Sequence, residues 1–171
     1  MEQASVIRAA IVIALAALLD AVVVPYLTFG FISPRLTLIA VVFAVAPLRD
    51  LQAVLLGFFG GILLDALGSE LFGVGALGGL LAAMLASRAS AVRRRGSERV
   101  LFAQVAGIAV AAYDLLGYSA RWLAGLGVPQ LGEYAVGGML PDAVINALLA
   151  FLIGGWLLNV VNIKPPHSWE K

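Results

Sequence analysis

The sequence predicts an all-α integral membrane protein with about six transmembrane helices. Of its 171 residues, 62% are hydrophobic and only 12% are charged, whereas a soluble domain is nearer half apolar and a quarter charged. The apolar segments fill nearly the whole chain. We therefore expect one six-helix membrane domain over residues 1–163 and a short cytoplasmic tail over residues 164–171.

Six apolar segments are candidates for spans, because about 20 apolar residues cross the hydrocarbon core and shorter spans occur. The second segment is short, and we expect it to borrow residues from both flanks. A long external connection, residues 119–137, is expected to include a short surface helix. The six segments are Ala9–Phe29, Leu36–Ala46, Leu51–Leu67, Leu71–Ser87, Val100–Tyr118 and Gly138–Val161.

Basic residues set the expected orientation. Arginines crowd the connection after the fourth segment, and the positive-inside rule places that loop in the cytoplasm. Six spans then put both termini in the cytoplasm and leave only Arg35 and Arg121 outside. We interpret the loop as a topology determinant, although its charge also suits anionic lipid headgroups. The predicted loop arginines are Arg88, Arg93, Arg94, Arg95 and Arg99.

Four aspartates, Asp20, Asp65, Asp114 and Asp142, interrupt the apolar segments. A carboxylate at helix-centre depth costs about 2.5–3.5 kcal/mol on insertion scales, so each needs a partner or a function. All but Asp20, which we place deeper, are expected near the external face. There we predict a structural ion-pair cluster of Asp65, Asp142, Arg35 and Arg121. The competing hypothesis is a proton or cation relay, which usually needs acids spread across the membrane depth.

Glycines recur every four residues in the third and fourth segments. Gly57 and Gly61 share a helical face with Asp65, and Gly75 and Gly79 repeat the spacing in the next segment. Small residues at this spacing let a second helix backbone approach closely. We therefore predict a helix-packing or partner-binding face here, with the two segments forming a hairpin that packs against itself or against a partner.

Enzymatic and cofactor functions find no support in the sequence. The single histidine, His167, lies in the polar tail, and no HExxH or Walker A motif occurs. The absence of cysteine excludes a disulfide framework and a thiolate metal site. We predict a non-enzymatic protein without a cofactor or metal, and nothing in the sequence indicates nucleic-acid binding.

Several short motifs follow one another in the first half of the chain. Pro34-Arg-Leu36 opens the second segment, and Pro47-Leu-Arg49-Asp50 makes a short basic break. A glycine-rich helix then ends in Leu-Leu-Asp65 and is followed by a glycine-containing turn. Together these motifs resemble those of the rod shape-determining protein MreD family. The turn reads Leu71-Phe-Gly73, where the family commonly has Pro-Leu-Gly. The motifs cover residues 30–100, and the rest of the chain matches by hydropathy alone.

The resemblance implies a scaffold subunit of the bacterial cell-elongation machinery in the inner membrane. Its implied direct partner is the bitopic protein MreC, bound through the MreC transmembrane helix. More distant implied partners are RodA, a class B penicillin-binding protein and MreB, besides membrane lipids. The family also looks similar in fold to the S components of energy-coupling-factor transporters, which gives an alternative function, a vitamin-binding transporter subunit.

Overall fold

The computed structural model describes residues 2–27, 33–68, 71–92 and 98–161, and every regular element among them is helical. Five helical segments are long and apolar enough to cross a membrane, and a sixth apolar helix, α3, is shorter. The predicted all-α membrane fold is confirmed. The elements are α1 (Glu2–Val22), α2 (Val24–Leu27), α3 (Leu36–Val45), α4 (Asp50–Leu67), α5 (Val74–Ala91), α6 (Glu98–Leu123), α7 (Leu131–Tyr134), the π-helix η1 (Ala135–Met139) and α8 (Leu140–Val161).

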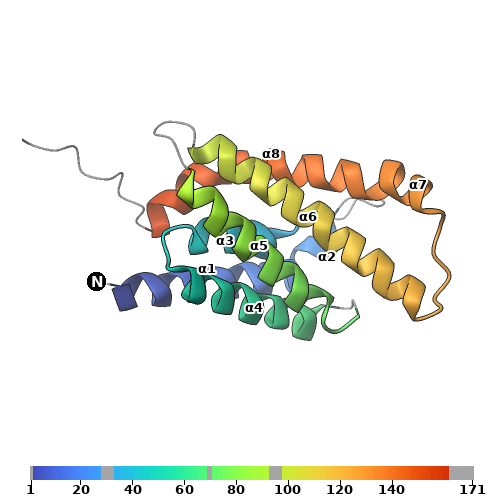
Figure 1. Cartoon of the computed structure of the whole chain (residues 1–171), viewed down its shortest axis with the longest axis horizontal. Coiled ribbons are helices and arrows are strands. Elements are labelled where there is room, and N and C mark those ends of the chain that lie inside the picture. Colours follow the sequence, from blue (N-terminus) through green and yellow to red (C-terminus); the bar gives the residue numbers. More distant parts are fainter. Residues whose placement is uncertain (1, 28–32, 69–70, 93–97, 162–171) are drawn as a thin grey trace, which may run out of the picture.

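The long helices lie side by side and alternate in direction (Figure 1). Helices α1, α4 and α6 leave the end of the bundle where α1 begins, and α3, α5 and α8 return towards it. Arg93, Arg94 and Arg95 of the predicted loop, and the predicted tail over residues 164–171, lie outside the described residues.

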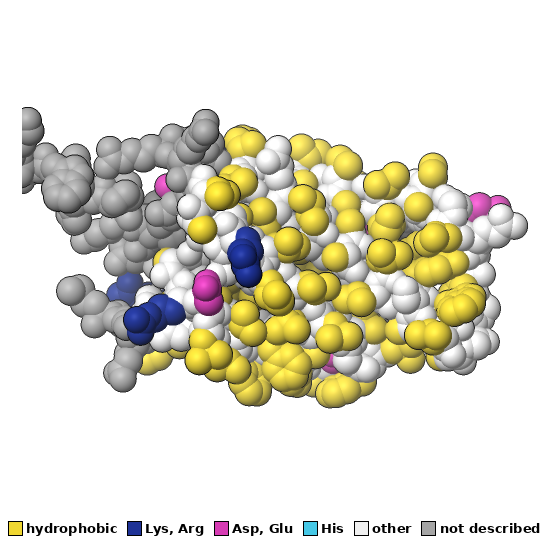
Figure 2. All heavy atoms as spheres, viewed as in Figure 1, with side chains coloured by type: hydrophobic (Ala, Val, Ile, Leu, Met, Phe, Trp, Pro, Cys, Tyr) yellow, Lys and Arg dark blue, Asp and Glu magenta, His cyan; other side chains and the backbone are white. Residues whose placement is uncertain are grey.

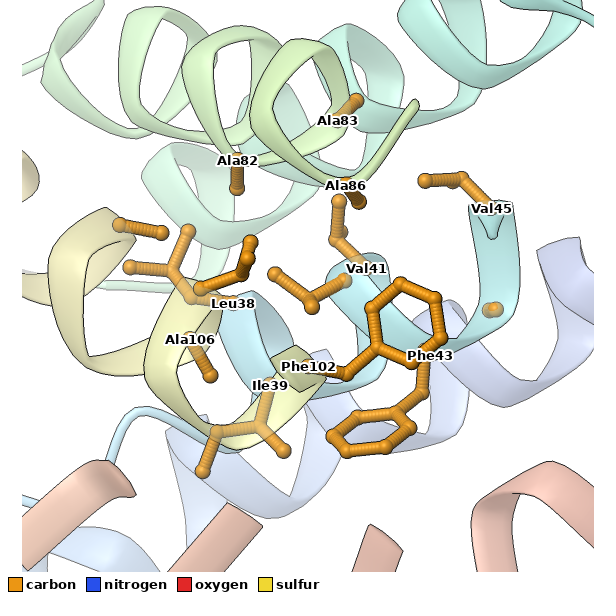
Figure 3. Close-up of a cluster of buried hydrophobic side chains, with 14 of the residues drawn as sticks. Leu38, Ile39, Val41, Phe43, Val45, Ala82, Ala83, Ala86, Phe102 and Ala106 are labelled. Atoms are coloured by element: carbon orange, nitrogen blue, oxygen red, sulfur yellow. The ribbon is translucent and has the colours of Figure 1, made fainter. Parts of the chain in front are cut away.

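Helix α3 is the centre of the bundle. Its side chains are apolar on every face apart from Thr37, and all its residues from Thr37 to Val45 are buried, as expected for a helix without a polar stripe. Phe43 meets Phe102 of α6 edge to face, with 5.7 Å between the ring centroids. Alanines of α5 and α6 complete this core and allow the neighbouring helices to approach closely (Figure 3).

Helix α3 does not extend into its flanks, contrary to the expectation for this segment. Its ten residues span about 15 Å, half of the roughly 30 Å hydrocarbon core. Pro34, which has no N–H, precedes the helix, and Pro47, which likewise has no N–H with which to continue it, follows Ala46. The helix therefore starts inside the bundle, where the protein itself must bind the free N–H groups of the first turn.

The two glycine faces meet each other within the α4–α5 hairpin. A Cβ atom on Gly57 would strike Ala83 and the Gly79 carbonyl, and one on Gly61 would strike the backbone of Gly75. The glycines thus bring the two backbones into direct contact. Of the two arrangements left open by the sequence, the hairpin adopts packing against itself.

Replacing Gly61 by alanine is expected to destabilise the hairpin. The new Cβ would lie 2.7 Å from Ala76 Cα, and both atoms belong to packed helices that cannot yield cheaply. A matched control is Gly117→Ala on α6, whose Cβ would meet only Val74 Cγ1 at an ordinary 3.7 Å. Thermal unfolding in detergent should show a clear loss for Gly61→Ala and no loss for Gly117→Ala. Equal melting temperatures for the two variants would contradict close backbone packing.

The last span has an irregular first part. Helix α7 continues through the π-helix η1 into α8, giving one apolar run over Leu131–Val161. The expected short helix in the external connection is therefore the beginning of this run. Pro141 lies in the first turn of α8, and its missing N–H is compatible with the wider π turn just before it. The next residue, Asp142, is buried and begins the polar site.

Candidate functional site: a polar cluster at two helix starts

Asp20 of α1 caps the start of α3 from outside that helix. One carboxylate oxygen accepts a hydrogen bond from the Leu36 N–H at 2.8 Å. The other accepts from the Thr37 N–H at 2.7 Å and from the Thr37 hydroxyl at 2.5 Å. A side-chain acceptor at a helix N-terminus binds free donors and interacts favourably with the helix dipole. Asp20, expected at greater depth than the other acids, thus lies against the same segment as Arg35.

Helix α8 binds the extended residues just before α3. Asp142 accepts a hydrogen bond from the Ser33 N–H at 2.8 Å, and Asn146 Oδ1 accepts from the Arg35 N–H at 2.7 Å. The Asn146 amide also donates to the Ser33 carbonyl at 3.1 Å. Because Pro34 has no N–H, every backbone donor from residue 33 to residue 37 is bound by a side chain of α1 or α8.

Arg35 is the cation of the cluster. Its guanidinium lies 3.7 Å from an Asp114 carboxylate oxygen and 4.0 Å from one of Asp142. It also lies over the Tyr113 ring, with Cζ 4.7 Å from the ring centroid, in the geometry of a cation–π contact. The arginine side chain is 20% exposed and those of Asp114 and Asp142 are 5% and 3% exposed. Three elements, the segment before α3, α6 and α8, are thereby joined through buried charges.

Asp65 caps the start of α5, as Asp20 caps the start of α3. Its carboxylate accepts three backbone hydrogen bonds, from Gly75 at 2.7 Å and from Gly73 and Ala76 at 2.9 Å. Gly73 has φ of +103°, in the left-handed region that favours glycine. Thus the aspartate that ends one glycine-rich helix binds the first turn of the next, with a glycine making the turn between them.

The structure brings together part of the predicted ion-pair cluster. Arg35 lies near Asp142, as hypothesised, and Asp114 joins them. Arg121 lines a cavity of about 170 Å³ with these three residues. Asp65 instead binds backbone N–H groups of its own hairpin.

The sequence reasoning missed the capping roles of Asp20 and Asn146. One signal was present, because the start of α3 carries no Ser, Thr, Asp or Asn in the N-cap position. Such a helix, buried in a membrane protein, needs acceptors from another element. Which element supplies them depends on the tertiary structure.

A second, larger cavity lies beside the cluster. It has a volume of about 450 Å³ and is lined by Asp20, Arg35 and Tyr113 together with apolar residues of α1 and α4. Among the described residues, no group of three or more acidic, histidine or cysteine side chains is arranged to hold a metal ion. The hydrogen bonds and ion pairs of the cluster join parts of the same chain.

The depth distribution of the acids bears on the relay hypothesis. Asp20 and Asp65 lie near the ends of α1 and α4, and Asp142 lies at the start of α8, so these three gather towards the end opposite the start of α1 (Figure 1). Asp114, near Arg35, belongs to the same group. The four therefore do not form a series across the bundle.

Comparison with known proteins identifies the family. The family model for the rod shape-determining protein MreD matches residues 3–162, nearly the whole chain. No curated protein sequence and no solved structure gives a significant match. The matched region contains every helix described above, apart from the first residue of α1, and the whole polar cluster. The chain therefore belongs to the MreD family, and its role is in the determination of rod shape.

Proposed function

We propose that the chain is a non-enzymatic scaffold subunit of the cell-elongation machinery and that it binds MreC through the MreC transmembrane helix. The family supports a role in shape determination. One structural observation supports a scaffold: the carboxylates of Asp20, Asp65 and Asp142 all accept hydrogen bonds from the protein's own backbone. The surface offered to other membrane proteins is chiefly apolar (Figure 2).

We further propose the bacterial inner membrane as the location, with the end at which α1 begins in the cytoplasm. Four described arginines, Arg8, Arg49, Arg88 and Arg99, belong to that end, and two, Arg35 and Arg121, belong to the opposite one. This asymmetry favours the orientation, because cytoplasmic flanks are enriched in basic residues. In this arrangement RodA, a class B penicillin-binding protein and MreB are reached indirectly, through MreC or lipid-embedded contacts.

Co-purification tests the scaffold proposal. Tagged chain should recover full-length MreC from detergent-solubilised membranes. A control MreC carries an unrelated apolar helix of equal length in place of its transmembrane helix. The tagged chain should not recover this control, because helix association in lipid depends on close packing rather than on apolarity. The MreC soluble domain is identical in the two proteins and serves as the internal control. Equal recovery of both MreC proteins would refute binding through the transmembrane helix.

The cavity of about 450 Å³ favours a second candidate, a vitamin-binding transporter subunit. Its size falls in the range of small-molecule pockets, and Arg35 and Tyr113 are the kind of groups that orient a ligand. Isothermal titration of the purified chain with water-soluble vitamins separates the two candidates. Saturable binding would favour the transporter subunit, and its absence together with MreC recovery would favour the scaffold.

A further inference from the structure

The helices around α3 form a ring that is open at one seam. Helices α1, α4, α5, α6 and α8 all pack against α3. Within this ring α1 packs on α4, α4 on α5, α5 on α6 and α6 on α8, but α8 and α1 barely touch. The seam between α1 and α8 is therefore the place where the ring lacks a helix-to-helix contact.

A groove of about 490 Å³ occupies this seam, and all its lining residues are apolar. Leu15, Leu19 and Val22 of α1 form one wall at a spacing of i, i+4 and i+7, so they project as a ridge along one helical face. Trp156 of α8 stands in the opposite wall. Ala40 of α3 lies at the floor and is almost fully buried.

We propose that the α1–α8 groove receives one apolar transmembrane helix, that of the bitopic partner; this inference rests on the proposed function. Apolar surface by itself does not drive association in lipid, whereas close packing does. A helix in this groove would pack against two walls at once, unlike a helix on the convex outer surface. Ala16 and Ala40 are small residues that allow close approach.

The groove also suits a helix in length and in position. From Val12 of α1 to Val23, the residue after α1, the groove extends about 17 Å, or three helical turns. The glycine faces of α4 and α5, the other surface suited to close helix packing, are already occupied by each other. The partner's helix would close the ring around α3 at the seam between α1 and α8.

Site-specific photo-crosslinking in native membranes tests the groove. A benzophenone amino acid is placed at Leu19 or Trp156 in the groove, and at Leu55 or Phe59 on α4 as controls. The pairs are matched in exposure, at 48% and 47% for the leucines and at 66% and 60% for the aromatic residues. The experiment uses the full-length chain and the full-length partner. Adducts to the partner's transmembrane helix should form from Leu19 and Trp156, and none should form from Leu55 and Phe59.

The outcomes separate the groove from the proposed function. Partner adducts from Leu55 or Phe59 alone would overturn the groove but leave helix binding intact. Adducts at Leu19 and Trp156 only to lipid, or only to a second copy of the chain, would also overturn it. If wild-type chain does not recover the partner, the proposed function fails and the groove proposal falls with it. As a second measurement, Leu19→Trp should reduce partner recovery and Leu55→Trp should not; equal recovery would overturn the groove.

Discussion

Replacing Asp65 by alanine is expected to lower the free energy of unfolding by about 2–4 kcal/mol, because three backbone N–H groups at the start of α5 lose their acceptor. The site is buried, with Asp65 only 6% exposed, so water replaces the carboxylate poorly. Asp65→Asn keeps one acceptor oxygen, and its loss should be intermediate. Unfolding by SDS titration in mixed micelles measures both variants.

The matched control is Asp50→Ala. Asp50 lies in the first turn of α4 and is exposed, and its carboxylate accepts a hydrogen bond from the hydroxyl of the half-buried Ser87. Water can replace this contact, so the loss should stay below about 1 kcal/mol. If Asp65→Ala is no more destabilising than Asp50→Ala, capping by Asp65 does not stabilise the hairpin.

Replacing Arg35 by leucine is expected to destabilise the bundle by about 3–5 kcal/mol, the usual effect of removing one partner from a buried ion pair. Asp114 and Asp142, both nearly fully buried, would lose the cation beside them. The packing of the guanidinium over Tyr113 would be lost too. Unfolding in mixed micelles should therefore begin at a lower SDS fraction.

Charge neutralisation tests the cause of that loss. In the double variant Arg35→Leu with Asp114→Asn, part of the stability should return, because one of the two uncompensated carboxylates is gone. Arg88→Leu serves as the control, since Arg88 is exposed at the end of α5. A double variant no more stable than Arg35→Leu would show that packing, rather than buried charge, explains the effect.

Most of the fold could be predicted from the sequence because hydrophobic segments, breakers and basic flanks are local signals. The third predicted span, Leu51–Leu67, differs from α4 only at its first residue. Helix α3 deviates because its short length is tolerated only inside a ring of other helices. Hydropathy detects an apolar segment there, but it cannot tell a short central helix from a span that extends into its flanks.

The polar site could be predicted only in part. The common level of the charged groups predicted that Arg35 or Arg121 would meet Asp65 or Asp142, and the structure contains the Arg35–Asp142 pair. The glycine spacing predicted a packing face, without deciding between the hairpin itself and a partner. The hydrogen bond from Ser33 to Asp142 joins residues 109 apart in the chain, and that from Arg35 to Asn146 joins residues 111 apart. Such pairs are set by the packing of α8 against α3. We expected Asp65 to pair with an arginine. The backbone N–H groups that it binds instead carry no signature in the sequence.

Three of the four acids in the apolar segments acquire a common explanation from these contacts. A helix that starts inside a membrane protein exposes N–H groups that neither water nor lipid can bind. Asp20 and Asp65 supply acceptors at the starts of α3 and α5, and Asp142 supplies one just before α3. The hydrogen bonds of these polar side chains thus hold the helices together.

A charge-free cluster in cells distinguishes a cluster that maintains the fold from one that carries ions. The variant Arg35→Gln, Asp114→Asn, Asp142→Asn keeps polar side chains at all three positions, and Asn at position 142 can still accept from Ser33. Cell width and length are measured after this variant replaces the wild-type chain. We expect rod-shaped cells wherever the variant keeps near wild-type thermal stability. Round cells carrying an equally stable and abundant variant would show that the charges do more than maintain the fold.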